Sequence, residues 1–323
     1  MSEPSLGRLA YFPASFFGMI MGITGTAIAF KKTESFWGFG SVMGQGLVYF
    51  ATLLFAILAL AYAAKIVRFP KEVAVELKHP VKMNFVPAIS ISLLLLSIAF
   101  YGLEQVGVSR ILWIVGAVIQ LSLTLWVLYN WVHHDFFVPE HSNPAWFIPI
   151  VGNIVVPIAG VHHAPLDISW FFFSIGLIFW VALKAILLNR IIFHAPLAER
   201  LVPTLFIFIA PPAVGFISYV ALNGGEVNQF AKVLYMFALF LTLLMAVSFG
   251  KFCKLNFALS WWAYTFPLAA MSIASFLMAQ KSGESFYQGI GMVVLSVLSV
   301  MVLWFGFKTF KAFKAGKICT NDH

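Results

Sequence analysis

Histidine clusters are the groups in this sequence that could hold a metal ion or transfer protons. One is His133-His134-Asp135 with His141, and the other is His162-His163 with Asp167. Adjacent histidines point to different sides of a helix, whereas a metal-binding helix presents two histidines four positions apart. We therefore expect solvated loop histidines, with neither a metal site nor a bound cofactor.

An intramembrane enzyme is another interpretation of the same histidines. It would need a nucleophile beside a base, or a complete ligand set, within reach of one another. No single apolar run of this chain contains either combination. We expect no enzymatic activity, and a stoichiometric metal or haem in the purified protein would contradict that expectation.

Composition indicates which elements must position any site. The chain has 323 residues, of which 61% are hydrophobic and 10% are charged. Soluble domains carry roughly a quarter charged residues, so we predict an all-α polytopic membrane protein with one transmembrane domain over 1–323. A bilayer span needs about 20 apolar residues. Ten runs meet that length: 10–30, 38–64, 84–102, 110–131, 144–161, 169–188, 201–222, 229–250, 255–279 and 286–307.

The basic residues indicate how these spans are oriented. With spans alternating in direction, fifteen of the 20 Lys and Arg fall on the side of both termini, and the tail of Lys308, Lys311, Lys314 and Lys317 carries much of this excess. Basic residues concentrate in cytoplasmic loops. We predict both termini in the cytoplasm, a multi-pass protein of a bacterial inner membrane, and no nucleic-acid partner despite the net charge of +8.

Prolines occur inside every odd-numbered run and in none of the even-numbered ones. They are Pro13, Pro87, Pro149, Pro211 and Pro267, with a second break at Pro157. This predicts five repeated helical hairpins. Broken backbone in lipid is tolerated where protein or a cavity covers it, so five proline-kinked helices should form an inner ring around a central path. The candidate lining and kink residues are these five prolines with Phe12, Phe16, Phe85, Phe147, Ser15 and Thr265.

The path predicted in this way carries no charge. The carboxylates Glu34, Glu104, Asp167, Glu226 and Glu284 fall in loops between the runs, whereas proton-coupled carriers usually hold one inside the membrane. Backbone dipoles and hydroxyls bind an anion weakly enough for it to leave. Hydroxyl and amide candidates are Ser15, Thr24, Ser90, Asn153, Ser260 and Thr265, each of which could instead bond to its own or a neighbouring helix. The spacing of Gly18, Gly22, Gly25, Gly40 and Gly44 indicates close helix packing.

A motif in the ninth run carries a resemblance to a known family. The segment Trp261-Trp262-Ala263-Tyr264-Thr265-Phe266-Pro267, with weaker support from Phe12-Pro13 and from His141–Phe147, resembles the tellurite-resistance/dicarboxylate transporter family. Its relatives include plant guard-cell slow anion channels. The resemblance implies ten helices in five hairpins around a pore, a homotrimer with one pore per subunit, and Phe266 as a gate. Nothing else in the sequence selects Phe266 from 35 phenylalanines.

Two functions remain open at this stage. The first is a passive channel for small inorganic anions in the lipid bilayer, closed by Phe266. The alternative is a secondary carrier exporting tellurite, sulfite or a C4-dicarboxylate. Channel flux should follow the voltage and ignore a proton gradient, whereas coupled flux should collapse with the gradient. The lack of carboxylates within the runs favours the channel.

Overall fold

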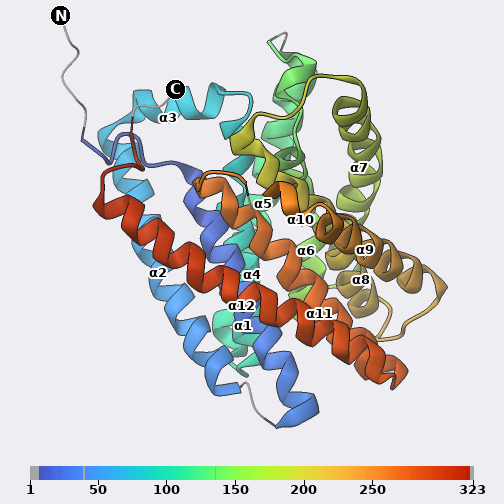
Figure 1. Cartoon of the computed structure of the whole chain (residues 1–323). Helices are drawn as coiled ribbons and strands as arrows, with labels where there is room; N and C mark the ends of the chain where they lie inside the picture. Colours follow the sequence, from blue (N-terminus) through green and yellow to red (C-terminus); the bar gives the residue numbers. More distant parts are fainter. Residues whose placement is uncertain (1–6, 39–40, 135, 253, 321–323) are drawn as a thin grey trace, which may run out of the picture.

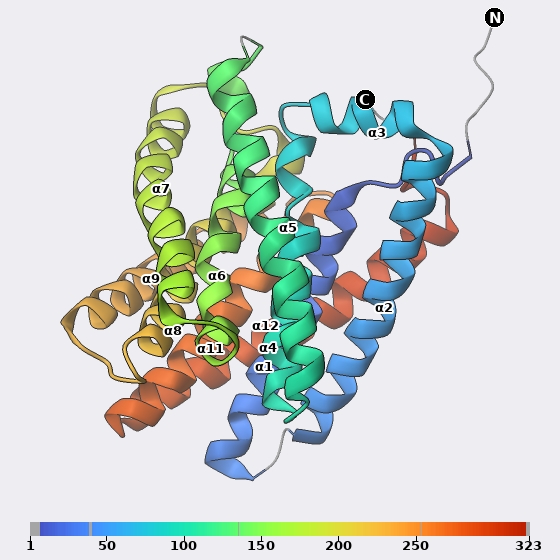
Figure 2. The same cartoon turned by 180° about the vertical axis from the view of Figure 1, so that it is seen from behind.

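The computed structural model describes residues 7–38, 41–134, 136–252 and 254–320, and Figures 1 and 2 show it from opposite sides. All regular structure in these residues is helical, and ten segments are long and apolar enough to cross a membrane. This confirms the predicted class and number of spans. The long helices are α1 (Phe17–Trp37), α2 (Ser41–Arg68), α4 (Ala88–Gly102), α5 (Val106–His133), α6 (Ile148–His163), α7 (Leu166–Phe193), α8 (Ala210–Leu222), α9 (Gln229–Val247), α11 (Thr265–Ser282) and α12 (Ser285–Lys314).

Buried and exposed helices alternate along the chain. In the apolar stretches that include α1, α4, α6, α8 and α11, between 72% and 94% of the residues are buried. In those of α2, α5, α7, α9 and α12, only 22% to 33% are buried. Apolar side chains exposed on so many faces suit a helix in contact with lipid. The described part of the chain therefore has five inner and five outer long helices.

The inner helices close on one another. In the order α1, α4, α6, α8 and α11, each packs against the next, and α11 packs back against α1. Each outer helix packs against the inner helix that precedes it in the chain. Short helix α3 (Pro70–Lys78) lies across one end of the bundle, beside the two ends of the described chain (Figure 1). We call this the α3 end.

The inner prolines mark where α-helix begins, and this corrects the expectation of kinks within helices. A 3-10 segment precedes the α-helical part of each inner span, at Ala14–Phe16, Lys82–Phe85, Pro144–Phe147, Glu199–Ile209 and Leu259–Tyr264. Pro87 caps α4, and Pro149 and Pro211 lie at the first positions of α6 and α8. The first-turn N–H groups have no partner within a helix, so proline removes no hydrogen bond there. Within the described α-helices, Pro157 is the proline in an interior position.

The helices also extend beyond the predicted runs, which moves several charges. Glu34, predicted in a loop, lies in the last turn of α1 and pairs with Lys31 at 2.8 Å. Asp167 lies in the first turn of α7. The predicted second run stopped at residue 64, but α2 continues to Arg68 and thus contains Lys65, which is 3% exposed. A charge inside an apolar helix needs a partner, and Lys65 has one in the site described below.

Candidate functional site

A cavity of about 780 Å³ opens at the α3 end, and we call it the vestibule. Its floor is made by the first turns of the five inner helices, and its rim by the N-terminal segment, the end of α3, and residues 308–320. The inner helices thus begin around one cavity, with their N-terminal ends turned toward it. A helix N-terminus carries a positive partial charge, so all five favour an anion there.

The vestibule is also strongly basic. Among the described residues that line it, Glu76 is the one carboxylate. Clefts lined by one sign of charge concentrate ions of the opposite sign. The basic lining residues are Lys82, Arg200, Lys308, Lys311 and Lys317, together with His79.

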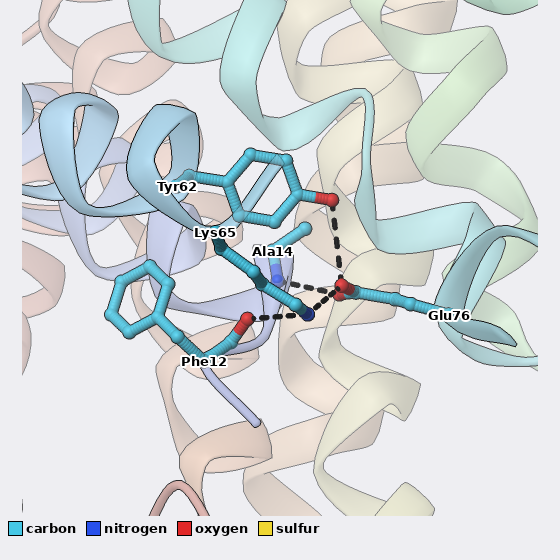
Figure 3. A network of polar contacts seen from close by, with 5 residues as sticks. All are labelled: Phe12, Ala14, Tyr62, Lys65 and Glu76. Atoms are coloured by element: carbon cyan, nitrogen blue, oxygen red, sulfur yellow. Dashed lines mark hydrogen bonds and ion pairs between the residues drawn. The ribbon is translucent and has the colours of Figure 1, made fainter. Parts of the chain in front are cut away.

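Glu76 is already neutralised by the buried Lys65, as Figure 3 shows. Lys65 Nζ donates to Glu76 Oε2 at 2.6 Å and to the carbonyl of Phe12 at 2.9 Å. The backbone N–H of Ala14 donates to Glu76 Oε1 at 2.7 Å, and the Tyr62 hydroxyl lies 3.4 Å from Oε2. The network ties α2 and α3 to the chain just before α1. It therefore fixes one wall of the vestibule and adds no net charge to it.

His79 lies at the rim, outside the membrane spans. Its Nδ1 accepts hydrogen bonds from the backbone N–H groups of Val81 at 3.1 Å and Lys82 at 3.3 Å. Burial, then the positive charges of Lys82 and Arg200, lower the pKa of His79 below its ordinary 6.5. The ring is therefore neutral at pH 7 and gains its charge only in more acidic solution.

A second, smaller cavity of about 30 Å³ lies further along the inner helices. We call it the apolar chamber, because every residue that lines it is glycine, alanine, valine, leucine, isoleucine or phenylalanine. All five inner helices contribute to it. A cavity of this lining stays dry.

The two cavities are lined by one face of each inner helix, in a shared register. On each inner span, four of the lining positions follow spacings of three, four and three residues, which keeps them on one side of a helix. Ile207 and Ala263 lie in the 3-10 segments that precede α8 and α11. The first two positions line the vestibule and the last two line the chamber. They are Gly18, Met21, Gly25 and Ile28; Ala88, Ile91, Leu95 and Ile98; Ile148, Val151, Val155 and Ile158; Ile207, Ala210, Val214 and Ile217; and Ala263, Phe266, Ala270 and Ile273.

Phe266 borders both the vestibule and the chamber. Of the described lining residues it alone lines both cavities, and it is 7% exposed. The residues at its level on the other four helices are Met21, Ile91, Val151 and Ala210. Phe266 therefore lies where the linings of the two cavities meet.

Close packing of α1 against α11 sets the position of Phe266. A Cβ atom added to Gly22 would lie 2.0 Å from Thr265 Oγ1, and one added to Gly25 would lie 2.7 Å from the Ala269 Cβ. These contacts leave no room for a side chain, so both glycines allow the helices to approach. This agrees with the packing expected of the glycine spacing, and Gly40 lies outside the described residues.

Other predicted site residues divide into two groups. Those that line the vestibule besides Phe266 are Pro13, Ser15, Phe85, Ser260 and Pro267. Those outside the lining of both cavities are Phe12, Phe16, Pro87, Pro149, Pro211, Phe147, Thr24, Ser90, Asn153 and Thr265.

Several residues of the second group make packing contacts or hydrogen bonds. Phe12 and Phe16 stack with ring centroids 4.8 Å apart. Ser90 Oγ donates to the Gln120 amide oxygen of α5 at 2.7 Å, and Asn153 Nδ2 donates to a hydroxyl of the same helix at 2.9 Å. Thr265 Oγ1 donates to a carbonyl one turn earlier at 2.7 Å. Ser90 and Asn153 therefore join neighbouring helices and Thr265 bonds within its own span, both of which the sequence had left open.

The paired histidines lie at helix ends rather than within loops, and His133, His134 and His162 are solvent-exposed, as expected. His162 and His163 form the last turn of α6, where His162 stacks on Tyr101 with centroids 4.2 Å apart. His163 Nε2 lies 2.7 Å from Ser109 Oγ of α5. Asp135 lies outside the described residues, and in the part that is described no group of three or more His, Cys, Asp or Glu could hold a metal ion.

Comparisons with known proteins match nearly the whole chain to one family. Residues 11–310 match the family SLAC1, described as voltage-dependent anion channel. An uncharacterized transporter of Methanocaldococcus jannaschii is 28% identical over 305 residues, covering 81% of this chain and 89% of the relative. The S-type anion channel SLAH3 of Arabidopsis thaliana is 29% identical over 302 residues, 92% of this chain and 47% of the plant protein. A tellurite resistance protein TehA homolog of Haemophilus influenzae is 25% identical over 283 residues, 86% of this chain and 82% of the relative.

Proposed function

The chain belongs to the SLAC1 family of voltage-dependent anion channels, and we propose that it conducts small inorganic anions passively and is closed by Phe266. The observation that carries the proposal is the position of this ring between the vestibule and the chamber. An apolar constriction closes a pore by excluding water. Current through the Phe266→Ala variant tests the proposal, as argued in the Discussion.

The proposed path attracts anions without holding them. Basic side chains and five helix N-termini face the vestibule, and beyond Phe266 the described lining residues carry no polar side chain. An ion drawn in by the vestibule finds no ligand that would retain it, and weak binding favours conduction.

A coupled carrier is the second candidate, suggested by the tellurite resistance relative. It would need a group that binds and releases protons or another ion along the path. Glu76 is the carboxylate that faces the vestibule. It already accepts hydrogen bonds from Lys65 Nζ, the Tyr62 hydroxyl and the Ala14 N–H. These contacts favour the channel.

The proposal extends to topology and assembly. We propose one transmembrane domain of five repeated hairpins around a pore, in a bacterial inner membrane. The vestibule and both termini would face the cytoplasm, because the basic residues gather there. The exposed apolar faces of the outer helices are available to lipid and to two further copies in a homotrimer.

Neutralising the vestibule should reduce anion current. In a Phe266→Ala background, Lys82→Gln with Arg200→Gln is expected to lower the current at low salt about two- to threefold, with a smaller loss at high salt, because the salt screens the charges. Patch-clamp recording at two chloride concentrations measures this. Lys232→Gln removes a charge outside both cavity linings and is the matched control. Equal losses at both salt concentrations would count against an electrostatic role.

Acidification should increase the same current. Because the pKa of His79 is lowered below 6.5, its charge appears as the pH on the vestibule side falls below that value. The added positive charge should raise anion current, and His79→Gln should flatten the profile between about pH 7 and 5. His194→Gln, an exposed histidine outside the cavity lining, is the control. An unchanged profile in His79→Gln would assign the pH response to another group.

A further inference from the structure

Cationic side chains from three separate segments of the chain line the vestibule without a carboxylate to neutralise them. The ion pairs among the described residues are Lys31 with Glu34 and Lys65 with Glu76, and neither includes one of these cations. Like charges gathered in one cavity repel one another, and an anion bound between them relieves that repulsion. The vestibule cations are Lys82, Arg200, Lys308, Lys311 and Lys317.

Such a set of charges favours a polyvalent anion over a single halide. One monovalent ion compensates one of the vestibule cations, whereas a chain of linked phosphates compensates several at once. The Arg200 guanidinium can bind two phosphate oxygens in parallel, and the lysines act as point charges. The N-terminal ends of the inner helices add backbone N–H groups and a positive partial charge to the floor of the same cavity.

Aromatic side chains line the vestibule together with these cations. Tyr11 lies in the segment before α1, and Phe257 lies in the segment before the 3-10 turn Leu259–Tyr264. Both are half-buried, so part of each side chain is open to the cavity. Nucleic-acid bases stack on aromatic rings without a requirement for particular hydrogen bonds. Phosphate-binding cations and stacking rings in one cavity are the combination that a nucleotide needs.

The sizes of the two cavities decide where such a ligand would stop. The vestibule, at about 780 Å³, lies within the range of about 300 to 1,000 Å³ that is usual for pockets holding small organic ligands. The apolar chamber of about 30 Å³ is far too small for one. An organic polyphosphate can therefore enter the vestibule but cannot pass Phe266 and the chamber beyond it.

We propose that the vestibule binds a nucleoside polyphosphate, with the phosphates on the vestibule cations and the base against Tyr11 or Phe257, and that the bound nucleotide blocks the path. The block rests on the proposed channel function, whereas the binding site does not. With the vestibule facing the cytoplasm, as proposed above, the site is open to cytoplasmic nucleotides.

Binding is measured first, on the purified chain with Phe266 intact. Isothermal titration calorimetry with ATP, in the absence of divalent cations, should show saturable binding. Lys311→Gln with Lys317→Gln is expected to weaken it about tenfold, because charge-assisted contacts to phosphate are lost. The control, Lys251→Gln with Lys254→Gln, removes two exposed lysines outside both cavity linings and should leave the affinity unchanged.

A second pair of ligands tests whether the site holds a nucleoside or phosphate alone. Tyr11→Ala with Phe257→Ala should weaken ATP binding about fivefold or more, because the stacked base loses its partners. The same variant should bind inorganic triphosphate as tightly as the wild type does, which also shows that it is folded. An unchanged affinity for ATP in this variant would overturn the assignment of a nucleoside.

The block is measured as current through the Phe266→Ala variant. ATP added on the vestibule side should reduce the anion current, and ATP added on the opposite side should not. Lys311→Gln with Lys317→Gln should raise the half-blocking concentration about tenfold, in parallel with its effect on binding. ATP that binds from the vestibule side but leaves the current unchanged would contradict the block.

The outcomes separate the nucleotide site from the channel itself. If Phe266→Ala conducts and the protein shows no saturable binding of ATP, this inference fails and the proposed channel stands. If ATP binds as expected and Phe266→Ala passes no current, the proposed channel fails and the block with it, while the binding site stands.

Discussion

Phe266→Ala should turn a nearly silent protein into a conducting one. The substitution removes the ring between the vestibule and the chamber and leaves the five-helix wall in place. Each 1.4 kcal/mol taken from a barrier raises a rate about tenfold, so an increase in anion current of about tenfold or more is expected. Voltage-clamp recording of membranes carrying equal amounts of each variant measures it.

Two further substitutions make this result specific. Phe85→Ala removes a phenylalanine that lines the vestibule but not the chamber, and it should keep the wild-type current. Phe266→Leu retains an apolar side chain of smaller size and should give an intermediate current. A current in Phe85→Ala as large as in Phe266→Ala would mean that a general loosening of the wall, and not the ring at this level, opens the path.

Glu76→Gln should strongly destabilise the fold. Lys65 and Glu76 are 3% and 6% exposed and lie 2.6 Å apart, and removing one partner of a buried ion pair typically costs about 3 to 5 kcal/mol because the other charge remains uncompensated. Thermal unfolding in detergent, followed by tryptophan fluorescence, should show a clearly lower midpoint. Glu34→Gln breaks the more exposed pair with Lys31 and should leave the midpoint nearly unchanged.

A double substitution tests whether charge compensation between Lys65 and Glu76 accounts for their contribution to stability. Lys65→Met with Glu76→Leu replaces both charges by apolar groups of similar volume and should recover much of the lost stability. If the double variant is less stable than Glu76→Gln, the hydrogen bonds to Phe12 and Ala14 would be the main contribution of this network, and not charge compensation.

The spans were predictable because a run of about twenty apolar residues is compatible with few structures other than a membrane-spanning helix. The alternation of inner and outer helices was predictable from the prolines, but the lining positions were not. Pro13 precedes Ile28 by fifteen positions, whereas Pro267 precedes Ile273 by six. The prolines therefore mark helix starts at different depths, and only the packed helices reveal the shared register.

The Lys65–Glu76 pair escaped prediction for a different reason. The predicted second span ended at residue 64, so Lys65 counted only as a cytoplasmic charge, and nothing local indicates that α3 brings Glu76 to Lys65. Phe266 itself came from family resemblance. The glycines at 22 and 25, which bring α1 against α11, were the local signal of where the two helices meet.

The reversal potential of the Phe266→Ala current tests the channel account most directly. It would be measured under a chloride gradient, first at equal pH and then with a proton gradient added. A passive anion channel predicts a reversal potential near the chloride equilibrium value that the proton gradient does not shift. A reversal potential that moves with the proton gradient, or uphill anion transport driven by it, would contradict the account and establish a coupled carrier.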